Sequence, residues 1–287
     1  MTHLLGVLFD GLAYGMLLFV LSVGLSVTMG LMGFVNLAHS AFAMLGGYLS
    51  VTLMQRAGMP FLATLPIAFV LVGAFSTIFE RTLYRRLYLA GELDQVLLTI
   101  GLVLMTVASC AYLWGTQQQE VNLPPYLFGR FSPFGIDLGY YRLFLIAVGA
   151  VIAVALVFGL ERTRFGAQLR AAVDNQRMAR GLGIDVNRVF ALTFAIGSGL
   201  AGLGGALAIN MVGLDPNFAT KYLVYVLLVV SVGGLGSVGG TFAAAVLLGI
   251  SDVAGKYYVP EAGAFIIYAV MVALLLWRPA GLFGRRV

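Results

Sequence analysis

The feature that most constrains this chain is a series of long apolar runs that carry almost no charge. A helix needs about 20 residues to cross the ~30 Å hydrocarbon layer of a membrane, and several runs reach that length. Of the 287 residues, 61% are hydrophobic and 10% are charged. In a soluble domain about 45–50% of the residues are apolar and about 25% are charged. This composition excludes a soluble enzyme, a disordered chain and a nucleic-acid-binding protein. The runs occupy residues 4–35, 41–53, 61–79, 96–114, 143–160, 189–212, 222–232, 241–250 and 264–277.

The spacing of the runs predicts an all-α, polytopic integral membrane protein, a single transmembrane domain over residues 1–287 with about 8–10 transmembrane segments. Some of these segments are expected to be discontinuous helices. The first run has 32 residues and one charge, Asp10, so either its start lies in the membrane interface or it contains a break. Runs 222–232 and 241–250 are short, and they flank the sequence GGLGSVGG.

Basic residues predict the orientation, because Lys and Arg are retained on the cytoplasmic side. Three arginine clusters lie on the same side of the membrane if an even number of crossings separates each from the next. If that side is the cytoplasm, the C-terminus is cytoplasmic and loop 115–141 lies outside. That loop is either a plain surface loop or faces an extracytoplasmic partner. The N-terminus is expected outside, and it lacks the basic region and cleavage site of a signal peptide. The clusters are Arg81, Arg85 and Arg86; Arg162, Arg164, Arg170, Arg177, Arg180 and Arg188; and Arg278, Arg285 and Arg286.

The stretch GGLGSVGG contains a literal GxGxxG match that includes Gly234, Gly236 and Ser237. A dinucleotide site would need a preceding strand in a soluble βαβ unit, which a membrane segment does not supply. Two interpretations stay open. The glycines allow close helix packing, or they interrupt a helix that lines a translocation pathway. Five glycines in eight residues favour the interruption.

Asn36 and His39 place an amide and an imidazole inside an otherwise apolar stretch. On a helix they would share a face, and there they either hold the bundle together by hydrogen bonds or line a pathway. A metal site is not expected, because the other histidine is His3 and the one cysteine is Cys110. The single cysteine also excludes an intrachain disulfide.

Catalysis is not expected, and neither is a cofactor bound by this chain. A serine hydrolase would need a serine placed against a histidine, for which His39 with Ser198 or Ser237 is the arrangement considered. The chain lacks an acidic DDxxD cluster, and it lacks the GxxxxGK[ST] loop that an ATPase needs, since Gly255 and Lys256 precede a tyrosine.

The segment 161–188 is too polar to span a membrane, and it carries a modest apolar stripe that predicts a helix of about four turns at the membrane surface. Gly181 and Gly183 are suited to end this helix. The segment is either inert or the contact through which a cytosolic partner acts on the bundle.

The two ends of the chain share an order of features. Near the start, an apolar run meets the break GLMGFVNLAHS, resumes at Ala41, turns near Pro60 and descends to Arg81. Near the end, a run meets GGLGSVGG, resumes at Thr241 and turns near Pro260. Duplicated halves with interrupted helices are typical of transporters.

Several separated motifs, in the same order along nearly the whole chain, resemble the permeases of branched-chain amino-acid ABC transporters, and most of all the LivH-type subunit. They are RAAVDNQRMARGLGIDVNRVFALTFAIGSGLAGLGGAL (170–207), GLMGFVNLAHSAFAMLGGY (30–48), GGLGSVGG (233–240) and WRPAGLFG (277–284).

This resemblance implies a multi-pass subunit of the bacterial inner membrane that imports a branched-chain amino acid or a related small solute such as another amino acid, an amide or urea. It implies a second permease, two cytosolic ATPase subunits that use ATP and Mg, and a periplasmic binding protein. Arg170-Ala171-Ala172 stands where related permeases have EAA, and Gln176 where they have Gly. The candidate residues for coupling are Arg170, Ala171, Ala172, Asn175, Gly181, Gly183 and Ile184, and the candidates for the pathway, from the polar residues and glycines noted above, are Asn36, His39, Gly234, Gly236 and Ser237.

An ion-coupled secondary transporter or channel is the main alternative, and an intramembrane enzyme is a more distant one. Ion coupling is expected to need an acid embedded in the membrane. The clear interiors of the predicted spans lack such an acid, since Asp10 and Asp252 are predicted near span ends, which argues against this alternative.

Overall fold

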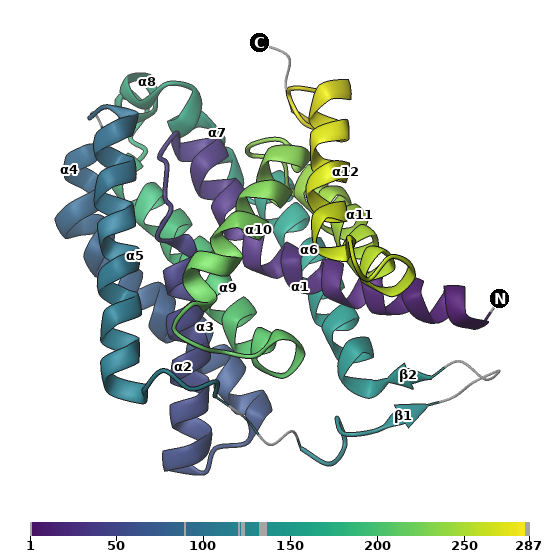
Figure 1. Cartoon of the computed structure of the whole chain (residues 1–287). Helices are drawn as coiled ribbons and strands as arrows, with labels where there is room; N and C mark the ends of the chain where they lie inside the picture. The colour runs from purple at the N-terminus through teal and green to yellow at the C-terminus, as the bar shows by residue number, and fades with distance from the viewer. Residues whose placement is uncertain (1, 89, 120, 122–123, 132–136, 285–287) are drawn as a thin grey trace.

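The computed structural model describes residues 2–88, 90–119, 121, 124–131 and 137–284, and it is a bundle of helices with one short strand pair (Figure 1). In chain order the elements are α1 (Thr2–Met32), α2 (His39–Ala57), α3 (Phe61–Phe79), the π-helix η1 (Glu80–Tyr84), α4 (Arg85–Leu87), α5 (Glu92–Trp114), β1 (Arg130–Phe131), β2 (Leu138–Gly139), α6 (Tyr140–Arg162), α7 (Arg164–Asp174), α8 (Gln176–Gly181), α9 (Val186–Val212), α10 (Phe218–Gly233), α11 (Val238–Tyr258) and α12 (Gly263–Trp277).

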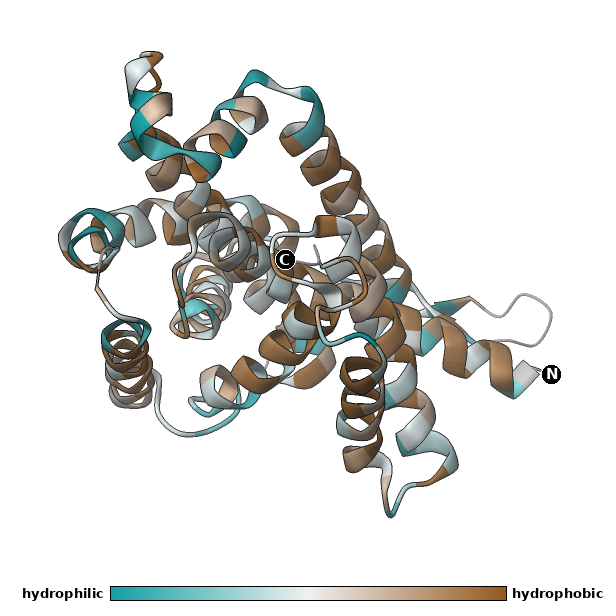
Figure 2. Ribbon diagram, turned by 90° about the horizontal axis from the view of Figure 1, so that it is seen from above, coloured by the Kyte–Doolittle hydropathy of each residue, from teal (hydrophilic) through white to brown (hydrophobic). Residues whose placement is uncertain are grey.

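Six helical stretches in the described residues are long and apolar enough to cross a membrane, which confirms a multi-pass, all-α membrane protein. They are α1, α3 with its continuation to Leu87, α5, α6, α9 and α11. With α2, α10 and α12 packed among them, the bundle fits the predicted number of segments. Figure 2 shows hydrophobic residues along the outer helices and hydrophilic residues at loops and helix ends, as a lipid environment requires.

The first apolar run is one uninterrupted helix as far as Met32, so no break divides its interior. The interruption comes at residues 33–38, where Gly33 has a φ of +66° that favours glycine. Figure 1 shows α1 lying obliquely across the bundle, and a tilted helix accommodates extra length.

The repeated order of features at the two ends of the chain corresponds to a repeated order of elements. α1, a break, α2, a tight turn and α3 follow each other in the first part. α10, a break at residues 234–237, α11, a turn and α12 follow in the last part. Both predicted interruptions therefore exist as breaks between helices.

The centre of the bundle is α9, which packs against α1, α2 and α3 through small residues. A Cβ added at Gly24 would overlap the backbone of Gly197, and one at Gly46 would overlap that of Gly202. Membrane helices approach this closely only where small residues face each other, because lipid supplies no hydrophobic force to drive them together.

The predicted arginine clusters gather at one end of the molecule in the described residues. Figure 1 shows α4, α8 and the C-terminus at this end, and the β1–β2 pair at the opposite end. Arg285 and Arg286 of the third cluster lie outside the described residues. This arrangement is the one that the orientation rule requires if the arginine-rich end is cytoplasmic.

Two engineered cysteines test this orientation. In a variant with Cys110 replaced by serine, a cysteine at the exposed Gln118 should react with a membrane-impermeant thiol reagent on intact cells. A cysteine at the exposed Gln176, in α8, should react only after the membrane is opened. The opposite pattern of labelling would invert the topology.

Candidate functional site

The first helix break separates Asn36 from His39. Asn36 lies in the non-helical segment 33–38, whereas His39 is the first residue of α2. The two residues therefore do not share a helical face. Gly33 leaves the helical conformation, and the following residues extend before the chain turns into α2. Both side chains are fully buried.

Side chains from neighbouring helices satisfy the polar groups of this break. The backbone N–H of Val35 donates to Oε1 of Gln95 at 3.0 Å, and the amide nitrogen of Gln95 donates to the carbonyl of Leu87 at 3.1 Å. The hydroxyl of Tyr84 donates to Oδ1 of Asn36 at 3.3 Å. Non-helical backbone at membrane depth requires such partners. Sequence reasoning missed Gln95, although a lone amide at the start of an apolar run was a usable signal.

Buried polar atoms without a protein partner surround His39. Its Nε2 lies 3.1 Å from the carbonyl oxygen of Leu21, while Nδ1 has no partner among the described residues. The same holds for Nδ2 of Asn36 and for the hydroxyls of Ser22 and Ser40. A buried polar group left unpaired costs about 1–3 kcal/mol, so these atoms favour contact with water or a polar solute.

The serine–histidine arrangement of a hydrolase is not formed. The hydroxyl of Ser198 makes no hydrogen bond among the described residues, and that of Ser237 accepts from the backbone N–H of Gly240 at 3.0 Å. The described residues contain no group of three or more His, Cys, Asp or Glu side chains that could hold a metal ion.

The second break, Gly234 to Ser237, is a tight connection between α10 and α11. Gly234 and Gly236 have φ values of +92° and +78°, which residues with a Cβ rarely adopt. Ser237 caps α11, and the N–H of Gly236 donates to the carbonyl of Ser26 at 3.1 Å. A Cβ at Gly30 would overlap the backbone of Gly236. The glycines therefore interrupt the helix and also pack closely on α1.

The segment 161–188 contains two short helices, α7 and α8, instead of the single helix predicted. Asn175 is extended, with a φ of −152°, and it joins α7 to α8. Its Oδ1 accepts from the N–H of Met178 at 3.0 Å and so caps α8. Asparagine competes for backbone groups in this way, and it favours helix ends over helix interiors.

Gly183 ends α8 as expected. Its φ is +82°, and its N–H donates to the carbonyl of Arg180 while the N–H of Ile184 donates to that of Ala179. This pair of bonds is the Schellman motif, which satisfies the last carbonyls of a helix.

The two short helices rest on a small hydrophobic core of their own, built from Leu169, Ala172, Ala179, Val186, Val189 and Phe190. We call this group the coupling core. Ala172 is fully buried in it, so this residue positions the segment and does not face solvent. Arg170, Asn175, Gly181 and Gly183 are exposed, and Ala171 and Ile184 are half-buried.

Two apolar side chains in α8 and at its C-cap are not buried in the coupling core. Met178 is 64% exposed, and the C-cap residue Leu182 is 79% exposed. Exposed apolar residues among arginines are typical of a surface that a protein partner covers.

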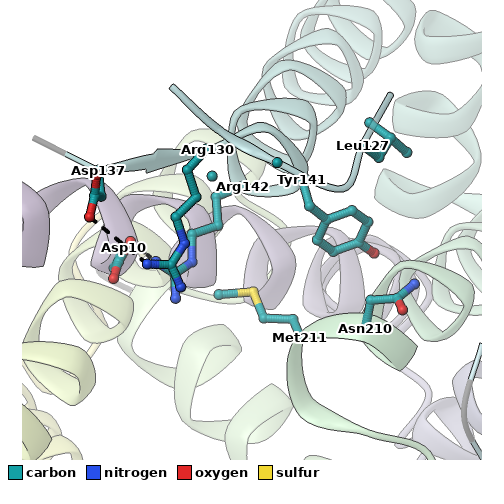
Figure 3. A pocket seen from close by; sticks show the side chains of 10 residues that line it. Asp10, Leu127, Arg130, Asp137, Tyr141, Arg142, Asn210 and Met211 are labelled. Carbon is teal, nitrogen blue, oxygen red and sulfur yellow. Dashed lines mark hydrogen bonds and ion pairs between the residues drawn. The ribbon is translucent and has the colours of Figure 1, made fainter. Parts of the chain in front are cut away.

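A polar pocket of about 400 Å³ lies at the opposite end of the molecule (Figure 3). Asp10 of α1 pairs with Arg142 of α6, and Arg130 of β1 lies 3.9 Å from Asp137. The first pair joins two helices of the bundle, and the second lies within loop 115–141. A bridge between Gln119 and Leu214 ties the loop to the segment that precedes α10. The loop is therefore a docked structure in its described part.

Asp252 was predicted near a span end, yet it is buried within α11 at 1% exposure. Its Oδ2 accepts a hydrogen bond from Nζ of Lys256, one helical turn further on. The pair is electrically neutral, while Oδ1 of Asp252 is buried without a partner among the described residues.

Comparisons with known proteins agree on one family. A family model described as "Branched-chain amino acid transport system / permease component" matches residues 7–275. BraD of Pseudomonas aeruginosa, a high-affinity branched-chain amino acid transport system permease protein, is 26% identical over 99% of this chain and 96% of its own length. LivH of Escherichia coli is 25% identical over 97% and 94%. LivM of Escherichia coli, also a high-affinity branched-chain amino acid transport system permease protein, is 27% identical over 93% of this chain and 68% of its own length.

Replacing Gln95 with leucine tests how the first break is held. The change removes the side-chain partner of the Val35 N–H and one of the two donors to the Leu87 carbonyl, so it should lower the free energy of unfolding by about 1–3 kcal/mol. Thermal unfolding in detergent measures the loss. Thr99→Val, one turn along α5, is the control because that hydroxyl bonds only within its own helix. An equal loss in both variants would contradict the assignment.

Proposed function

Because the chain belongs to the family of permease components of branched-chain amino acid transport systems, we propose that it is one membrane subunit of an ATP-driven importer. In this proposal it pairs with a related permease and binds two cytosolic ATPase subunits. A solute-binding protein delivers a branched-chain amino acid, or a similar small polar solute, from outside. The chain itself transports and does not hydrolyse ATP.

The observation that carries the proposal is the contact between the coupling core and the end of α1. Met32, the last residue of α1, packs on the coupling core, together with Tyr88 and Leu160. The first helix break begins at the next residue. A displacement of α7 and α8 by a partner would therefore act directly on the break that contains Asn36.

The second break is connected to the same helix. The carbonyl of Ser26, in α1, accepts a hydrogen bond from the N–H of Gly236 at 3.1 Å. The side-chain hydroxyl of Ser26 accepts a second one from the hydroxyl of Thr241 at 2.8 Å. α1 thus contacts the coupling core at one end and holds both breaks along its last two turns. Coupling between two distant sites requires one structural element with two positions, and binding at either site must favour one of these positions. α1 meets the first condition for such an element, because it contacts both regions.

The pathway proposed for the solute passes the two breaks. Asn36, His39 and the neighbouring serines offer unpaired polar atoms there, and Gly234, Gly236 and Ser237 form the adjacent connection. We place the coupling contact on α7 and α8. The binding protein would dock on the opposite end, where the pocket of Figure 3 presents charges of both signs.

A matched pair of substitutions tests the coupling contact. Leu182→Asp places a charge on an exposed tip of α8, so it should weaken ATPase association by at least about 1 kcal/mol and reduce solute-stimulated ATP hydrolysis while thermal stability stays unchanged. Ala172→Asp buries an unpaired charge in the coupling core and should destabilise the chain by roughly 3 kcal/mol or more.

The comparison uses the purified complex, with subunit ratio, ATP hydrolysis and unfolding temperature measured on the same samples. Wild-type ATPase association and transport in Leu182→Asp would remove α8 from the coupling contact.

Substitution of Gly236 tests the pathway. Gly236→Val forces a Cβ into a positive-φ conformation, at a cost of about 1–2 kcal/mol, and should block transport per assembled complex far more than it lowers stability. Gly202→Val is the packing control, because a Cβ there lies 2.8 Å from Cβ of Val72 inside the bundle. Parallel losses of stability and transport in both variants would show that the glycines serve packing alone.

A further inference from the structure

A cleft of about 310 Å³ opens at the arginine-rich end, between η1 and the first turns of α9. Its lining combines three arginines and two acids, and both acids are already engaged. Glu80 is buried and accepts from the hydroxyl of Tyr88 at 2.8 Å. Asp185 caps α9 and pairs with Arg188 at 2.9 Å. The charged lining residues are Glu80, Arg81, Arg85, Asp185 and Arg188.

The cleft therefore carries one net positive charge, with its arginine side chains exposed at the surface. Arg188 is 82% exposed even though it pairs with Asp185. A guanidinium binds phosphate oxygens well, because its planar fork donates two parallel hydrogen bonds. The charge and the donors together favour a phosphate-bearing anion.

Two apolar stripes run from this cleft along the membrane-spanning helices. On α3, Val70 and Ile78 are exposed below Arg81 at helical spacing. On α9, Leu192 and Ile196 follow Arg188 at intervals of four residues. Residues spaced this way lie above one another on one face of a helix. α3 and α9 pack side by side, and Arg81 and Arg188, which head the two stripes, line the same cleft, so the surface at this end is charged at the top and apolar below it on both helices.

We propose that this surface binds an anionic phospholipid, with the phosphate on Arg81, Arg85 and Arg188 and the acyl chains along Val70, Ile78, Leu192 and Ile196. The charge at the top and the apolar stripes below it match the two parts of such a molecule. A free phosphate would satisfy the arginines and leave the stripes unused. Basic pockets between membrane helices bind lipid headgroups in this manner.

The cleft also adjoins the coupling core. Asp185 follows Ile184, and the next residue, Val186, belongs to that core. A bound headgroup would hold the first turn of α9 beside η1, and would do so whichever solute the protein carries.

The test uses the intact complex in nanodiscs of phosphatidylcholine with increasing phosphatidylglycerol, and counts retained phosphatidylglycerol by native mass spectrometry. Arg81→Gln with Arg188→Gln should weaken retention about fivefold for each arginine removed, the ratio that corresponds to ~1 kcal/mol per basic residue at an anionic surface. Arg86→Gln is the matched control, because Arg86 is exposed in the same segment but does not line the cleft. It should retain the lipid as the wild type does.

A second pair, Ile78→Gln with Leu192→Gln, keeps every arginine and should also lower retention. This pair carries the test if the arginine variant does not assemble. Equal retention in all variants would overturn the proposal. Displacement of the lipid by inorganic phosphate at similar concentration would identify a free-anion site instead. Unchanged lipid retention with loss of the ATPase subunits would identify a protein contact.

Discussion

Every backbone N–H and C=O group at membrane depth must find a partner inside the protein, and this requirement shapes both interruptions of the helices. Hydrocarbon offers no hydrogen bonds, so a break survives only where side chains or neighbouring backbone replace the lost helical bonds. Gln95 does this for the first break and the carbonyl of Ser26 does it for the second. Residues that look isolated in the sequence therefore hold the two interruptions in place.

Close packing is the second consequence of the same requirement. The backbone of the second break reaches Ser26 only because Gly30 and Gly236 leave no side chain between the two segments. α1 then contacts that break near its end and the coupling core at Met32. This geometry gives a physical route from the arginine-rich surface to the buried polar atoms around His39, carried by one helix.

The sequence was sufficient for the features that depend on composition and local conformation. The apolar runs predicted the membrane class, the glycines predicted both breaks, and Gly183 marked the end of α8. It was insufficient where one side chain decides between two local structures. The capping bond of Asn175 divides the predicted surface helix in two, and nothing in the periodicity reveals that bond. The burial of Ala172 and the exposure of Leu182 depend on how α7 and α8 fold onto α9, which is tertiary information.

In the proposed mechanism, partner ATPases act on this chain through α7 and α8. The most direct measurement is the protein composition of the complex isolated from its own membrane through a tag on this chain, in mild detergent. We expect a second permease of the same family and two ATPase subunits for each copy of this chain. Recovery of the chain alone, in a form that transports solute in vesicles without ATP, would contradict this mechanism.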